Sequence, residues 1–142
     1  MMATKREQIM QRLEAIARSV PGLAAGSVSR ERAAPYSTDE CPALDVSPEG
    51  DEARSVGAGL DAHELTIRVR VWTAGDGASA LADPVVEAFH NALHADAGLA
   101  ALVANVETGG ADFDDADADL HLGRTTQRYR ITYHTRRGSL AA

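Results

Sequence analysis

An alternation of apolar and polar residues between positions 65 and 72 constrains the fold of this chain more than any other feature. The apolar residues of this run are Leu65, Ile67, Val69 and Val71, and the residues between and after them are Thr66, Arg68, Arg70 and Trp72. Because side chains two positions apart point to the same face of a strand, the run predicts a strand with one apolar and one polar face. Residues 126–135 repeat the pattern, with Tyr129, Ile131 and Tyr133 on the apolar side. Both strands therefore need a layer that covers their apolar face.

Two segments have the spacing of helices that supply such a layer. Apolar residues recur every three or four positions at Ile9, Leu13, Ile16 and Val20, and again at Val85, Val86, Phe89, Ala92 and Leu93. Thr4 and Glu7 have the spacing of a capping box at the start of the first helix. A Pro-Gly pair at 21–22 predicts the end of this helix. Asp83 and Pro84 fit the N-cap and first position of the second helix, because proline lacks the N–H that has no partner there.

The remaining segments predict three shorter strands, a polar turn at 33–40 and two loops. The strands are expected at 27–32, 43–46 and 103–108, and runs rich in Gly, Asp, Glu and Ser predict mobile loops at about 47–59 and 109–123. The resulting order is α-β-β-β-α-β-β. Because 142 residues fit one domain, we predict a single domain over residues 1–142. Its fold class is α+β, with a mostly antiparallel sheet of about four to five strands and two helices on one face.

The second predicted loop is strongly acidic. Its five clustered aspartates are Asp112, Asp114, Asp115, Asp117 and Asp119. An EF-hand loop needs glycine at position six and glutamate at position twelve, and a loop that starts at Asp115 has Leu120 and Thr126 there. Alanines separate the carboxylates and nothing apolar encloses them, which disfavours a catalytic role. At this point two roles stay open for this segment, a contact with a partner or a solvated loop.

The sequence has no catalytic constellation, and we predict that the protein is not an enzyme and has no cofactor or metal site. His90 and His94 have the i, i+4 spacing of helical zinc ligands, but Asn91 stands where the His-Glu-x-x-His motif has its glutamate. The lone cysteine, Cys41, excludes an internal disulfide and a cysteine-based zinc site. Zinc binding by the purified chain would revive the enzyme hypothesis.

Charge and hydropathy limit the partners. A formal net charge of −7 does not attract nucleic acid through the overall field, and it favours solubility. No stretch approaches the ~18 apolar residues of a membrane span, and residues 1–9 lack the apolar core of a signal peptide. A cytoplasmic setting without membrane contact is therefore expected.

Arginines dominate the polar faces of the two clearest strands. If these strands are neighbours, Arg68, Arg70, Arg128 and Arg130 share one sheet face with Trp72. Arginine and tryptophan are enriched where interfaces carry binding energy, so these five residues are interface candidates, with a solvated sheet face as the alternative. The aspartate segment of a neighbouring copy is the expected complement, in a head-to-tail contact that closes into a ring if the rotation per subunit permits.

In the order and spacing of its segments, the chain resembles the phage tail terminator family, the minor tail protein U-like proteins. In the first half, the resemblance lies in REQIMQRLEAIARSVPG, CPALDVSPEGDEA and HELTIRVRVW. In the second half, it lies in DPVVEAFHNALHADAGLAALVANVETGG and QRYRITYHTRRG. Together these stretches cover nearly the whole chain.

The resemblance implies a structural virion protein without enzymatic activity. Members of this family form a ring, usually a hexamer, at the head-proximal end of a tail tube, where the ring ends tube polymerisation and joins tail to head. The implied partners are further copies of this chain, the tail tube protein and a head–tail connector or neck protein, with DNA only as passing cargo. The implied location is the tail or neck of the virion, after assembly in the host cytoplasm.

A ring of this kind suggests a function for the acidic segments. An acidic lining would repel the phosphate backbone, so that DNA slides through the ring. We hypothesise that either the Asp112–Asp119 segment or the Ser47–Glu52 segment faces the lumen or a partner ring.

Two alternatives remain. A tail completion or head–tail joining subunit of the neck belongs to the same class of protein. A small-molecule or regulatory α+β binding domain belongs to a different class, and it predicts an enclosed pocket lined by apolar residues with a few convergent polar groups.

Overall fold

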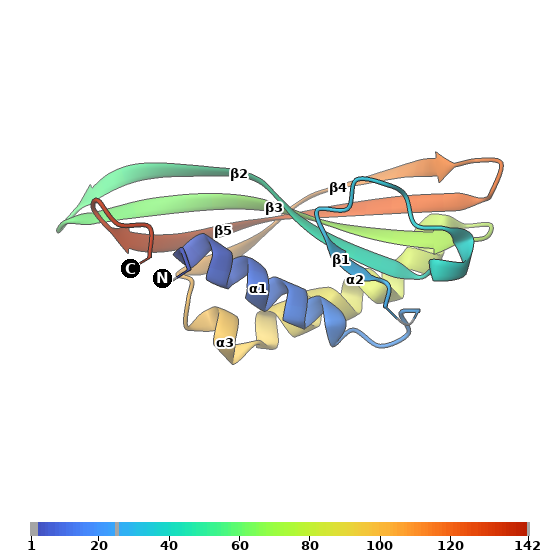
Figure 1. Cartoon of the computed structure of the whole chain (residues 1–142), viewed down its shortest axis with the longest axis horizontal. Coiled ribbons are helices and arrows are strands. Elements are labelled where there is room, and N and C mark those ends of the chain that lie inside the picture. Colours follow the sequence, from blue (N-terminus) through green and yellow to red (C-terminus); the bar gives the residue numbers. More distant parts are fainter. Residues whose placement is uncertain (1–2, 25, 142) are drawn as a thin grey trace.

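In a computed structural model that describes residues 3–24 and 26–141, a long twisted sheet carries its helices on one face (Figure 1). The elements are α1 (Lys5–Arg18), β1 (Val28–Arg30), the 3-10 turn η1 (Thr38–Glu40), β2 (Ala43–Gly57), β3 (Leu60–Ala74), α2 (Ala78–Ala95), α3 (Ala97–Ala100), β4 (Asn105–Asp117) and β5 (Leu122–Arg136). The predicted order of helices and strands and the α+β class are confirmed.

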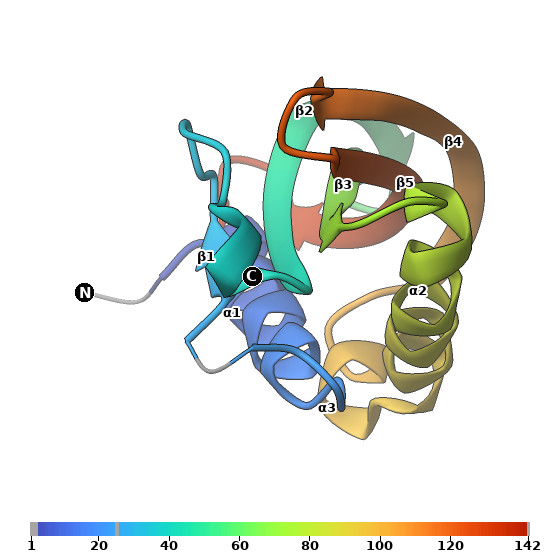
Figure 2. The same cartoon turned by 90° about the vertical axis from the view of Figure 1, so that its right-hand side faces the viewer.

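The sheet has the strand order β1-β2-β3-β5-β4. β1 is parallel to β2 and all other neighbours are antiparallel. β3 lies at the centre, and it pairs with β5 along its full length, from Leu60 opposite Arg136 to Ala74 opposite Leu122. Seen end-on, α1, α2 and α3 all lie on one side of this sheet (Figure 2). The β2–β3 and β4–β5 turns lie at opposite ends of the long axis (Figure 1).

The core lies between the helices and the inner face of the sheet. Its largest fully buried side chains include Ile9, Met10 and Leu13 from α1, Phe89 and Leu93 from α2, and Leu44, Leu65, Ile67, Tyr129 and Tyr133 from the strands. Except for Met10 and Leu44, these residues belong to the alternating and helical patterns of the sequence, so periodicity identifies most of this core.

The start of α1 confirms one half of the expected capping box. Thr4 Oγ1 accepts a hydrogen bond from the Glu7 amide at 3.1 Å. The Glu7 side chain instead accepts two hydrogen bonds from Arg30 on β1, at 2.6 and 2.7 Å. The Arg30 guanidinium lowers the pKa of Glu7, and this pair links α1 to the edge of the sheet.

The two segments expected as loops, 47–59 and 109–123, are mostly strand. β2 continues to Gly57 because its residues pair with β3 as far as Leu60, and residues 57–59 then make the turn in the left-handed backbone region that glycine favours. β4 continues to Asp117 because its residues pair with β5, and only 118–121 form a turn. Charged side chains made both segments resemble loops, although each pairs along a neighbouring strand.

The predicted start of the second helix is also wrong. α2 begins at Ala78, with Gly77 as its N-cap, so Pro84 lies inside the helix. The first turn packs closely on β5, where a Cβ on Gly123 would lie 2.1 Å from the Ala78 side chain. Glycine at position 123 therefore allows the helix to start on the sheet.

Candidate functional site

The register of the sheet gathers the predicted interface residues on the face opposite the helices. Arg68 lies directly across from Arg128, and Trp72 lies across from Arg124. Arg70 and Arg130 have the same parity on β3 and β5 as these residues, so all of them share this outer face. The conditional prediction that the four arginines and Trp72 share one sheet face is therefore confirmed.

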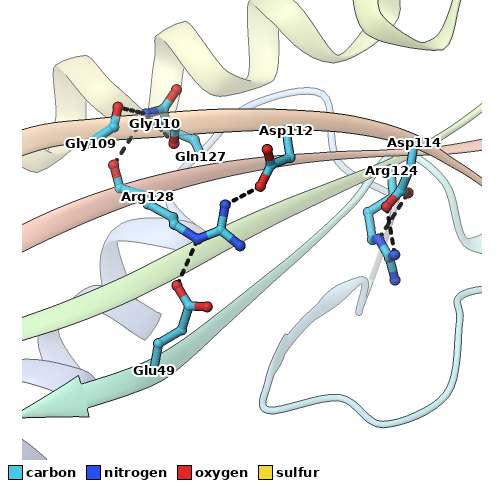
Figure 3. A network of polar contacts seen from close by, with 8 residues as sticks. All are labelled: Glu49, Gly109, Gly110, Asp112, Asp114, Arg124, Gln127 and Arg128. Carbon is cyan, nitrogen blue, oxygen red and sulfur yellow. Dashed lines mark hydrogen bonds and ion pairs between the residues drawn. The ribbon is translucent and has the colours of Figure 1, made fainter.

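Acidic residues of the same chain pair with the arginines of β5 (Figure 3). Arg128 forms ion pairs with Asp112 on β4 and, at 2.9 Å, with Glu49 on β2. Arg124 reaches both carboxylate oxygens of Asp114, at 3.1 and 2.8 Å. The hydrogen bonds that Arg128 donates to Asp112 and to Glu49, the first having the larger effect, raise the pKa of Arg128 and keep this guanidinium charged. Two of the five clustered aspartates thus have partners within the subunit.

The pairing continues toward the start of β4 and is exposed there. Arg130 contacts Glu107 at 2.9 Å, and about half of each side chain is exposed. Gln127 donates to the Gly109 carbonyl at 3.0 Å beside the irregularity between Thr108 and Ala111. Exposed ion pairs contribute only about 0–1 kcal/mol each. They do, however, cancel much of the positive charge of this face.

Arg70 and Trp72 are covered by the subunit itself. Arg70 is only 8% exposed, and it pairs with the fully buried Asp45 and donates to the Arg32 carbonyl at 2.7 Å. Trp72 is 2% exposed and meets Tyr36 edge-on, with ring centroids 6.0 Å apart. The segment before β2 therefore occupies the place expected for a partner at these two residues.

Arg68 differs from the other arginines of the outer face. Its Nε atom is buried without a hydrogen-bond partner, and no ion pair joins it to another residue in the described part of the chain. The hydroxyl of its cross-strand neighbour Ser47 is also buried, and it has no hydrogen-bond partner among the described residues.

The remaining aspartates lie near the β4–β5 turn. The Asp117 carboxylate accepts the amides of Asp119 and Leu120 at 3.1 and 3.3 Å, and so shapes the turn. Asp115 and Asp119 are exposed and have no ion pair among the described residues. Within residues 3–24 and 26–141, no three His, Cys, Asp or Glu residues gather in a way that could hold a metal ion.

The histidine pair on α2 is joined to the sheet. His90 lies 3.1 Å from the hydroxyl of Tyr129 through Nδ1, and its ring meets that of His94 edge-on at 4.6 Å. Burial raises the pKa of Tyr129 to about 12, so this phenol remains protonated at neutral pH.

A buried polar cluster around His63 was missed by the sequence analysis. His63 contacts Asp51 at 3.1 Å and Thr135 at 2.9 Å, and it stacks on Tyr133 with centroids 4.5 Å apart. Burial and the hydrogen bond to Asp51 raise the pKa of Tyr133. The signal was available, because the apolar parity of 65–71 extends back to position 63. The cluster joins β2, β3 and β5 at the end of the core.

The surface hollows of the described residues are small. One hollow of about 280 Å³ lies beside Val20, Leu23 and Val28, and another of about 210 Å³ is lined largely by polar residues of β2 and β3. Both fall below the roughly 300–1,000 Å³ that is typical of ligand pockets. None of the described helices has both the length and the apolar character needed to cross a membrane.

Comparison with known proteins gives a likeness of fold. No protein-family model matches the chain, and no curated protein sequence matches it. A chain of a solved structure described as the virion of a native gene transfer agent particle is similar, with a TM-score of 0.53 and 15% sequence identity. The match covers 93% of this chain and 92% of that chain. The two proteins thus share their fold over nearly their whole lengths.

Proposed function

We propose that this protein is a structural subunit of a virion, a tail terminator that forms a hexameric ring at the head-proximal end of a tail tube. The ring ends tube polymerisation and provides the surface that joins tail to head. The observation that carries this proposal is the fold likeness to a gene transfer agent virion chain over nearly the whole of both chains. The resemblance of the sequence segments to tail terminators supports the finer assignment.

The outer face supports a role in assembly without chemistry. Arginines and acidic residues of β2, β4 and β5 balance each other there, and the described hollows are small. Such a surface fits contacts between proteins better than it fits an enclosed small ligand. Around a ring, the net charge of −7 on each subunit would keep passing DNA from adhering.

The proposal is tested by tube termination. Tail tube protein of the same virion is polymerised with and without this protein, and tube lengths are measured by negative-stain electron microscopy. We expect shorter tubes with a ring of density at one end. Unchanged lengths without end density would overturn the tail terminator assignment. Binding to the connector without any effect on the tube would favour a tail completion or head–tail joining subunit of the neck.

A further inference from the structure

Among the residues that the structure describes, the exposed large apolar side chains lie toward the two ends of the sheet. They are Val56, Leu60 and Leu140 at one end, and Leu81, Phe113 and Leu120 at the other. β3 runs between these ends, and its fifteen residues span roughly 45–50 Å at ~3.4 Å per residue. Figure 1 shows the two turns at the extremities of the molecule, far from each other.

The end formed by the β2–β3 turn and the last residues of β5 is basic. Residues 54–62 and 135–138 contain three arginines, Arg54, Arg136 and Arg137, and a single acid, Asp61. All three arginines are exposed, and none forms an ion pair with another described residue. We call this surface, with Val56 and Leu60, the basic end.

The end formed by the β4–β5 turn and the start of α2 is acidic. Residues 73–79 and 114–124 contain five aspartates and one arginine. Phe113 is 64% exposed beside them, at a hollow of about 260 Å³ that Ala78, Ser79 and Thr125 help to line. We call this surface, with Phe113 and Leu120, the acidic end.

We propose that the acidic end of one copy binds the basic end of the next copy, with Val56 and Leu60 packed against Phe113 and its hollow. The two ends are complementary in charge, and each offers exposed apolar side chains. An end-to-end contact between two like ends would place like charges together, which is unfavourable, so an end-to-end contact between copies is head-to-tail. Contacts of this kind close into a ring or continue as a filament, depending on the rotation per subunit. This inference rests on the proposed ring and names its subunit interface.

The free aspartates make the acidic end available for such a contact. Asp112 and Asp114 are already paired with arginines of β5, whereas Asp115 and Asp119 form no ion pair with any residue that the structure describes. They are therefore the carboxylates expected to meet Arg54 and Arg136 of the neighbouring copy. Arginine is suited to this role, because its planar fork can bind a carboxylate through two hydrogen bonds.

Charge reversal at the two ends tests the interface. Self-association of the full chain is measured by analytical ultracentrifugation up to ~1 mM, a concentration that detects even weak specific contacts. One variant carries Arg54→Glu and Arg136→Glu, a second carries Asp115→Lys and Asp119→Lys, and a third carries all four changes. We expect each two-residue variant to associate at least about tenfold more weakly than the unchanged chain. The four-residue variant should recover association, because the complementarity is restored in reverse.

A matched control reverses charges elsewhere. Asp83→Lys with Glu87→Lys changes net charge as much as the acidic-end variant does, on the exposed surface of α2. The control should associate like the unchanged chain. Monomers at every concentration, equal loss in the control, or no recovery in the four-residue variant would each overturn the proposed interface. Failure of the tube test with intact charge-dependent association would reject the tail terminator role and leave the interface standing.

Discussion

Leu65 and Arg68 lie three residues apart on β3, but on opposite faces of the sheet with very different surroundings. Leu65 is fully buried in a continuous apolar core beneath the helices. Arg68 lies on a face where charged side chains from four strands meet. The inner face is stabilised by removal of apolar surface from water, which is non-directional and large. The outer face depends on directional pairs, most of which are weak because they are exposed.

The difference between the two faces of the sheet indicates which of them tolerates substitution without loss of stability. An inner face packed at high density tolerates few substitutions without loss of stability. Most of the outer face contributes little to folding, so its residues can serve contacts with other subunits. The Arg70–Asp45 pair and Trp72 under Tyr36 are exceptions, because these side chains lie on the outer face and are nevertheless buried.

The largest effect is expected in the core. Phe89→Ala removes a ring that is buried against Tyr129, and should lower the free energy of unfolding by about 3–5 kcal/mol. Urea denaturation followed by far-UV circular dichroism measures this change. A loss below about 1 kcal/mol would mean that the helical layer does not hold the sheet as described.

The next largest effect is expected at the buried ion pair. Asp45→Ala leaves the Arg70 guanidinium without its carboxylate, which should cost about 3 kcal/mol, the lower part of the range for such a loss. The effect is at the lower end because Arg70 keeps its hydrogen bond to the Arg32 carbonyl. Replacing both partners, as Asp45→Leu with Arg70→Met, should recover much of the loss in the same denaturation assay. If the double variant is no more stable than Asp45→Ala, the loss of unfolding free energy in Asp45→Ala does not come from an unpaired charge on Arg70.

A smaller effect is expected where α3 begins. Asp96 accepts a hydrogen bond from the Leu99 amide at 2.8 Å and two from Arg12 at 2.6 Å, so Asp96→Ala should cost about 1 kcal/mol through loss of the cap. The Arg12 side chain lowers the pKa of Asp96 below its unfolded value of about 3.9. The carboxylate therefore contributes its full stability above pH ~4, and loses it as the pH falls through the lowered folded-state pKa. The difference between the unchanged chain and Asp96→Ala should be constant from pH 7 to 5 and shrink below pH 4. If the difference in unfolding free energy grew as the pH fell, the folded-state pKa of Asp96 would not be lowered as described.

The smallest effect is expected on the exposed part of the outer face. Arg130→Ala removes an exposed pair with Glu107 and should change the unfolding free energy by at most about 1 kcal/mol. Thermal unfolding at low and high salt checks this, because screening should remove what effect there is. A larger loss of unfolding free energy that does not depend on salt would mean that Arg130 stabilises the fold.

Patterns with a short period were predictable from the sequence, and long-range pairing was not. The alternation at 65–71 and 126–135 predicts which residues of β3 and β5 lie on the inner face. It also predicts that the arginines of these two strands lie together on the other face. The sequence predicts loops for the outer parts of β2 and β4, because acidic residues and glycines dominate them. Their stabilising partners, such as Arg124 and Arg128, lie elsewhere in the sequence. A local pattern carries no information on such partners.

The burial of Trp72 was not predictable from the sequence either, because it depends on a contact with a distant segment. Residues 33–40 were expected to form a polar turn, and that segment brings Tyr36 onto the outer face, where it buries Trp72. One aromatic residue in a polar segment does not reveal which strand it will cover. The predicted interface roles of Arg68, Arg128 and Arg130, and the lumen role of the acidic segment, stay predictions.

The mass of the protein in solution tests the central claim, a ring-forming structural subunit, most directly. Light scattering is recorded over a wide concentration range, with and without magnesium, and again after mixing with tail tube protein. We predict one discrete closed oligomer, a hexamer, in at least one of these states. A monomer in all of them, or aggregates that grow without limit, would contradict it.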